Sequence, residues 1–275
     1  MKHVKGPMSF IVFLLSLWFL ATLNFSCNSS RTVDPTDLRP FHRVTGVVVT
    51  NCDSVRDTLN KMPVGTIALA QLTRNDTILP NALVEIDTFA LTDADSMYVL
   101  ADTNCNVFTV GSYDLKLTEG NKLDTEVSIT FADDFSVDIT QPANRIANGN
   151  QDVSLSWTGS AQSDGYIIAA VLRDSLGTGF GYSDYVTSQA TFATFPTEAF
   201  YQGGFADPDT GWYYLYVYSY TGTPDSSLAE EYLPMSLPSQ LPGPSFEARD
   251  FEARFGTIRI ARRDSVHLVL LALGE

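Results

Sequence analysis

Few side chains in this sequence have the types and spacings that catalysis requires. The three cysteines and three histidines form no zinc or redox motif. The sequence also contains no nucleophile elbow, no H-E-x-x-H motif and no glycine-rich phosphate loop. Adjacent carboxylates such as Glu230 and Glu231 are typical of solvated loops, although a glycosidase pair can be far apart in sequence. We therefore predict a non-catalytic protein without metal or cofactor, and rank a glycan-active enzyme third among its functions.

The aromatic run over residues 212–220 is the pattern in this sequence best suited to binding. Leu215 and Val217 are the residues of this run that we expect to face a core. Strand alternation then places four tyrosines on the opposite face: Tyr214, Tyr216, Tyr218 and Tyr220. Tyrosine gives a large contact area at low entropic cost, so this face is the candidate site for a glycan or protein partner. Alternatively, neighbouring strands or residues 221–254 cover the face, because tyrosine also favours strands without any binding role.

The start of the chain has the order of a secretory signal. Lys2 and Lys5 precede an apolar run, and the small residue Ser26 stands directly before Cys27. The apolar run is shorter than the roughly 20 residues of a membrane span. This favours a cleaved signal peptide, residues 1–26, over an uncleaved membrane helix.

In these residues the chain resembles bacterial lipoprotein precursors of the Bacteroidota type. The resemblance implies that Cys27 is lipidated, and each buried CH₂ of its acyl chains would contribute about 0.8 kcal/mol of membrane binding. Asn24 stands where such precursors usually have leucine, so ordinary signal cleavage stays open. Residues 27–42 would then be the lipidated cysteine and a tether. We expect an exported protein anchored to the outer membrane, on its periplasmic face or at the cell surface.

The net charge limits the partners. The formal charge is −15 at pH 7, and a chain this acidic is repelled by nucleic acid and by anionic lipid head groups. We therefore expect no nucleic-acid partner. The expected partners are the membrane, through the lipid anchor, and a protein or glycan.

Lipidation of Cys27 would leave Cys52 and Cys105 as the remaining cysteines. An oxidising compartment permits a disulfide between them. Closing a loop of that length would stabilise the fold by about 4 kcal/mol in the chain-entropy model. Two buried, unpaired thiols are the alternative.

Short alternating runs separated by Asn, Asp and Gly predict an all-β fold in the first half of the chain. Residues 79–86 and 111–115 resemble transthyretin-like or carboxypeptidase-regulatory-like modules of exported proteins. The resemblance implies a β-sandwich over residues 43–137.

From residue 138 onward the chain resembles a fibronectin type III or related immunoglobulin-like domain. Val153, Leu155 and Trp157 would face the core from the second strand, and Tyr213 takes the tyrosine-corner position of the sixth. The full expectation is two tandem immunoglobulin-like β-sandwich domains after a signal peptide and short tether.

The second domain, residues 138–275, departs from the fibronectin pattern in one segment. Residues 221–254 are rich in proline and are interpreted as a long inserted loop. Residues 257–261 and 265–270 would then close the sheet.

These features give one leading function and one alternative. The leading hypothesis is a non-catalytic cell-envelope lipoprotein that binds a protein or glycan through its β-sandwich domains. The alternative is a structural or assembly component of the envelope with no small ligand.

Replacing Cys27 tests the anchor. Cys27→Ala removes the acyl acceptor, so we expect the variant in the soluble periplasmic fraction and the wild type in the membrane fraction. Release of the wild-type protein by a salt wash, without detergent, would contradict lipidation.

Overall fold

The computed structural model describes residues 40–51, 65–121, 123–148, 151–172, 181–201, 209–248, 250–261 and 264–270. The described residues are mostly strands, which confirms the predicted all-β fold. The strands of the first half are β1 (His42–Asn51), β2 (Gly65–Arg74), β3 (Thr77–Ile78), β4 (Leu83–Ile86), β5 (Phe89–Ala90), β6 (Thr92–Ala94), β7 (Met97–Asp102), β8 (Gly111–Glu119) and β9 (Leu123–Phe131).

The second half of the chain contributes the remaining elements. Its strands are β10 (Val137–Gln141), β11 (Ile146–Asn148), β12 (Val153–Trp157), β13 (Gly165–Leu172), β14 (Gly181–Thr187), β15 (Phe192–Phe195), β16 (Gly211–Gly222), β17 (Phe246–Ala248), β18 (Phe251–Ile260) and β19 (Asp264–Val269). The short helices are η2 (Thr197–Phe200), α2 (Ser226–Ala229) and η3 (Glu230–Tyr232).

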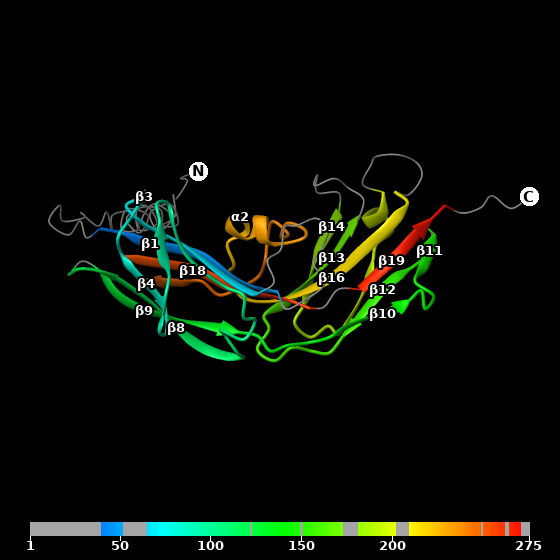
Figure 1. Ribbon diagram of the computed structural model, residues 1–275, viewed down its shortest axis with the longest axis horizontal. Helices are drawn as coiled ribbons and strands as arrows, with labels where there is room; N and C mark the ends of the chain where they lie inside the picture. The colour runs from blue at the N-terminus through cyan, green and yellow to red at the C-terminus, as the bar shows by residue number, and fades with distance from the viewer. Residues whose placement is uncertain are drawn as a thin grey trace, which may run out of the picture. The chain divides into compact units, whose positions relative to one another are not determined.

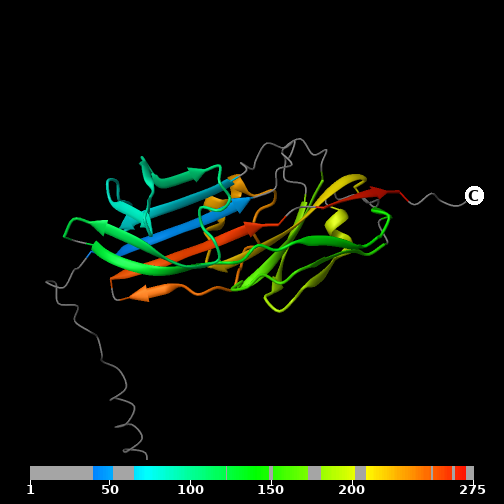
Figure 2. The same ribbon diagram turned by 60° about the horizontal axis from the view of Figure 1, so that its bottom comes forward.

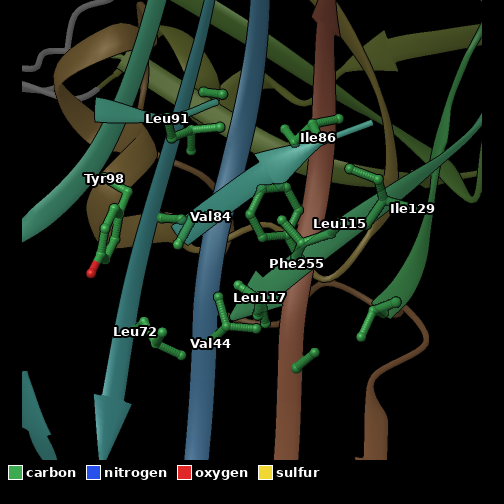
Figure 3. Close-up of a cluster of buried hydrophobic side chains, with 14 of the residues drawn as sticks. Val44, Leu72, Val84, Ile86, Leu91, Tyr98, Leu115, Leu117, Ile129 and Phe255 are labelled. Carbon is green, nitrogen blue, oxygen red and sulfur yellow. The ribbon is translucent and has the colours of Figure 1, made fainter. Parts of the chain in front are cut away.

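A first sandwich is built from two sheets with a shared core. Strands β18, β1, β2, β7 and β6 neighbour one another in one sheet, and the other has the order β5-β4-β8-β9. Val44, Leu72 and Phe255 point from the first sheet toward Ile86 and Leu115 of the second (Figure 3). All five side chains are buried, as strand alternation requires of a face that covers a core.

A second sandwich follows in the chain. The sheet β10-β12-β15 packs against a sheet in which β14, β13, β16, β19 and β11 are neighbours. Val153, Leu155 and Trp157 are buried in its core, as predicted. The hydroxyl of Tyr213 donates to the backbone oxygen of Asp209 at 3.0 Å, which is the bond expected of a tyrosine corner.

Strand β18 connects the two sandwiches. It pairs in parallel with β1 along ten positions, from His42 opposite Phe251 to Asn51 opposite Ile260. Its other edge pairs antiparallel with the end of β16. Figures 1 and 2 both show β18, in orange to red, beside β1, in blue. A strand that we assigned by sequence to residues 138–275 thus completes the sheet of the first sandwich.

The prediction of a long inserted loop over residues 221–254 is wrong at both ends and in the middle, because these residues contain strand and helix. Strand β16 continues to Gly222 and β18 begins at Phe251, while α2, η3 and β17 lie between them. The carboxylate of Asp225 caps α2 by accepting from the backbone N–H groups of Ser227 and Leu228. Phe251 is buried in the first core, and this burial accounts for the early start of β18.

Ion pairs reinforce the pairing of β18 with its neighbours. Arg43 and Glu252 lie opposite each other in the β1–β18 register, and the Arg43 Nε donates to Glu252 at 2.8 Å. This hydrogen bond lowers the pKa of Glu252, with a further bond from Arg254 acting in the same direction. Because the folded-state pKa lies below the unfolded one, the stabilisation is present at neutral pH and is lost as the pH falls through the folded-state value.

A buried arginine links β18 to two loops. The Arg259 side chain donates to the backbone oxygen of Phe108 at 3.0 Å and forms an ion pair with Asp134. Phe108 belongs to the first core and Asp134 to the connection between β9 and β10. One guanidinium therefore holds the sheet, a loop of the first sandwich and the connection to the second.

Gly46 provides a test of the β1–β18 contact. Phe255 lies opposite Gly46 in the register, and a Cβ at Gly46 would lie 2.3 Å from the Phe255 ring and 2.6 Å from the Leu69 oxygen. Gly46→Ala should therefore destabilise the fold by about 1–3 kcal/mol in denaturant unfolding. The control is Gly159→Ala, whose Cβ would meet nothing closer than 3.8 Å. Equal stabilities of the two variants would contradict the packing described.

Candidate functional site

The tyrosine face predicted as a binding site is buried. The predicted alternation is present, because Leu215 and Val217 belong to the core of the second sandwich. On the opposite face, Tyr216, Tyr218 and Tyr220 are no more than 1% exposed. The structure therefore corrects the prediction of an open tyrosine face.

A third core covers these tyrosines. It extends over one face of the continuous sheet, with contributions from β1, β2, β13, β16 and β18. Ala229, Leu233 and Leu237, all from the segment predicted as a loop, pack onto it. The Tyr220 hydroxyl donates to the backbone oxygen of Pro242 at 2.7 Å, and burial raises its pKa. The alternative interpretation, cover by residues 221–254, is the arrangement observed.

The beginning of the aromatic run remains accessible. Trp212 is 40% exposed, while the next tyrosine of this face, Tyr214, is partly buried. The Trp212 ring stacks on the ring of His267, with centroids 4.9 Å apart and planes at 15°. Ile146, which is 47% exposed, lies on the other side of His267. We call these three residues the Trp212 surface.

Strand pairing positions the Trp212 surface. Trp212 on β16 lies opposite His267 on β19, and His267 lies opposite Ile146 on β11. Neighbouring strands are about 4.8 Å apart, so the row extends about 10 Å. Sequence analysis missed this surface because no local pattern brings three such distant residues together. The signal available was Trp212, the one residue on this face of the aromatic run that is not a tyrosine.

A cavity of about 490 Å³ lies elsewhere, beside the first sandwich. Its walls come from β9, the turn at 162–164, the end of β16, residues 244–246 and β18. Two carboxylates, Glu126 and Asp164, line it, and no basic side chain does. Its volume is within the range of ligand-binding cavities. Sequence analysis did not identify it.

The cysteine predictions are only partly within the described residues. Cys27 and Cys52 lie outside them. Cys105 is partly exposed and forms no disulfide with another described residue, and its Sγ lies 3.4 Å from the backbone oxygen of Asn51, the residue before Cys52. The disulfide between Cys52 and Cys105 stays a prediction.

The described ranges contain neither a candidate metal-ion cluster nor a candidate membrane-spanning helix. There, no three His, Cys, Asp or Glu side chains are grouped so that they could hold a metal ion. In the same ranges, no helix has the length and apolar character needed to cross a membrane.

The sequence matches no family model and no curated protein. The similar solved structures include fibronectin type III and immunoglobulin domains. The FN1–FN3 domains of chicken CNTN1 are 15% identical, with 81% of this chain and 65% of that chain covered and a TM-score of 0.28. A tetra-tandem repeat from the extending region of a large adhesion protein is 14% identical, with 83% and 49% covered and a TM-score of 0.25.

A third similar structure is SGBP-B from a mixed-linkage glucan utilization locus of Bacteroides ovatus, in complex with a mixed-linkage heptasaccharide. It is 12% identical, with 86% of this chain and 62% of that chain covered and a TM-score of 0.20. This chain thus spans less than two thirds of each of the three structures described. Likenesses this distant transfer no ligand or partner to this chain.

The burial of the tyrosines predicts how alanine variants behave. Tyr216→Ala should destabilise the fold by about 3–5 kcal/mol, because the lost ring leaves a cavity in the third core. Trp212→Ala, four residues earlier on the same strand, should cost about 1 kcal/mol, mainly from the stack on His267. Denaturant unfolding checks both. A Tyr216→Ala variant as stable as Trp212→Ala would show that the tyrosine face is open.

Proposed function

We propose that this chain is an exported, non-catalytic binding protein of the bacterial cell envelope, and that it binds a glycan at the Trp212 surface. The observation that carries the proposal is the exposed Trp212 ring, held in place by its stack on His267. Because one face of the ring is stacked on His267, the opposite face is the one that would receive the C–H side of a sugar ring, at low entropic cost since the ring is already oriented.

The rest of the Trp212 surface suits the same ligand. Ile146 extends the apolar contact to a third strand, and the ring nitrogens of His267 can exchange hydrogen bonds with sugar hydroxyls. The surface is set on paired strands, which position side chains more rigidly than loops do.

We propose that the chain is anchored to the envelope through Cys27. Acyl chains on Cys27 would hold the protein on the outer membrane, and residues 28–39 would serve as the tether, because His42 already belongs to β1. A glycan-binding module on such an anchor would retain saccharides at the envelope without cleaving them. Catalysis has no part in the proposal.

Affinity electrophoresis and calorimetry test the proposal. The probes are soluble polysaccharides, with mixed-linkage glucan heptasaccharide among the oligosaccharides. Trp212→Ala should weaken binding about fivefold to thirtyfold, because loss of one stacked aromatic contact removes about 1–2 kcal/mol. The matched control is Phe192→Ala, which removes another exposed aromatic ring, on β15. Retained binding in Trp212→Ala, or equal loss in both variants, would contradict the proposal.

A further inference from the structure

Strand β9 has an edge that other strands leave open. Among the described strands it pairs only with β8. On its other side, the backbone oxygen of Thr130 accepts hydrogen bonds from the hydroxyls of Thr221 and Thr257. The second of these bonds is 3.2 Å long. The Thr130 carbonyl therefore points away from β8.

Alternation extends this orientation along β9. Residues two apart in a strand direct their backbone groups to the same edge. The backbone N–H and C=O groups of Ser128 and Glu126 therefore also point away from β8. Both residues line the 490 Å³ cavity, and no hydrogen bond to their backbone groups is found at this edge among the described residues. The edge is capped at Thr130 and open from 126 to 128.

The cavity wall behind this edge is apolar. Val127 and Ile129 reach it from β9, and Ala253 and Phe255 from β18. All four are buried members of the first core. Phe246, which is 45% exposed, stands at the same cavity on β17. A strand added beside β9 would direct every second side chain toward this wall.

The charged groups of the cavity are acidic. Glu126 and Asp164 line it, and the lining contains no Lys, Arg or His. Asp164 also accepts from the backbone N–H of Gly222 at 2.7 Å, so its carboxylate is fixed at the wall. Lys116 lies opposite Glu126 on β8 and is not among the lining residues. The cavity therefore favours a cationic group.

We propose that the open edge of β9 binds an extended segment of a partner protein. The segment pairs with the backbone of Glu126 and Ser128, as in other cases of strand addition to a sheet edge. It inserts an apolar side chain toward Phe255 and places a Lys or Arg beside Glu126 and Asp164. A row of backbone donors and acceptors at strand spacing fits a peptide better than a saccharide.

The test is a titration of the isotopically labelled full-length chain with a synthetic octapeptide, followed by amide chemical shifts. In the peptide, valine alternates with threonine and one central threonine is replaced by lysine. We expect saturable shifts centred on residues 126–130 and slower hydrogen exchange of the Ser128 amide. Absence of saturable shifts at millimolar peptide, or shifts centred elsewhere, would overturn the proposal.

Two acidic residues of β9 give a matched pair of charge variants. Glu126→Gln should weaken peptide binding about threefold to fivefold at low salt, since one exposed charge pair is lost. Asp124→Asn removes the same charge from the same strand but outside the cavity lining, and should leave the affinity unchanged. Equal effects of the two variants would show that the peptide responds only to the net negative charge of the protein, and would overturn the assignment of Glu126.

Ser128→Pro tests the edge itself. Proline removes the N–H that points to the open edge, and proline is tolerated at that side of an edge strand. Peptide binding should be lost while the melting temperature stays close to that of the wild type. If Ser128→Pro does not fold, the chemical-shift changes and the two charge variants still decide whether the peptide binds at the edge of β9.

One ligand and one variant separate this proposal from the glycan surface. Trp212→Ala should bind the octapeptide with unchanged affinity, whatever it does to glycan binding. Shifts at residues 126–130 produced by mixed-linkage glucan heptasaccharide, and not by the octapeptide, would assign the cavity to a saccharide and overturn the peptide proposal.

Discussion

Both sandwiches depend on the pairing of β18 with β1 on one edge and with β16 on the other. The first sandwich lacks its β18 strand until the chain has passed through the second, because β1 begins at residue 42 and β18 at residue 251. The Arg43–Glu252 pair and the buried Arg259 fix the position of β18 within this arrangement. The two halves therefore share one sheet instead of meeting at a surface interface.

The continuous sheet explains the third core. A sheet that extends through both sandwiches has a second face, and that face is apolar from β2 to β13. The segment after β16 covers it with Ala229, Leu233 and Leu237. Tyrosines suit this position because their rings fill the core while a hydroxyl such as that of Tyr220 reaches a backbone acceptor. On this face of β16, the cover buries Tyr216, Tyr218 and Tyr220 and leaves Trp212 exposed.

Local patterns in the sequence were sufficient for several features of the fold. Alternation gave the strand over residues 153–157 and the opposite faces of Leu215 and Tyr216, because the period of a strand is fixed by its geometry. The hydrogen bond of Tyr213 was implied by the resemblance to a fibronectin type III domain, which places this residue at the tyrosine-corner position near the start of β16. Such features depend on residues close together in the chain.

Pairings between distant segments could not be predicted in the same way. Nothing in residues 42–51 specifies that β18 is their neighbour. Alternation shows that the two faces of a strand differ, but it does not show which segment covers each face. One signal was available in the segment predicted as a loop: Ala229, Leu233, Leu237 and Leu241 recur every fourth residue among its prolines. The candidate site was missed for the same reason, since Ile146, Trp212 and His267 meet only through strand pairing.

Native-state hydrogen exchange at increasing denaturant measures directly whether β18 makes the two halves one cooperative unit. If it does, the slowest amides of β1, β16 and β18 should exchange through a single opening, with the same free energy and the same denaturant dependence. Exchange of the β1 and β2 amides through a separate, lower-energy opening that leaves β16 protected would contradict the shared sheet.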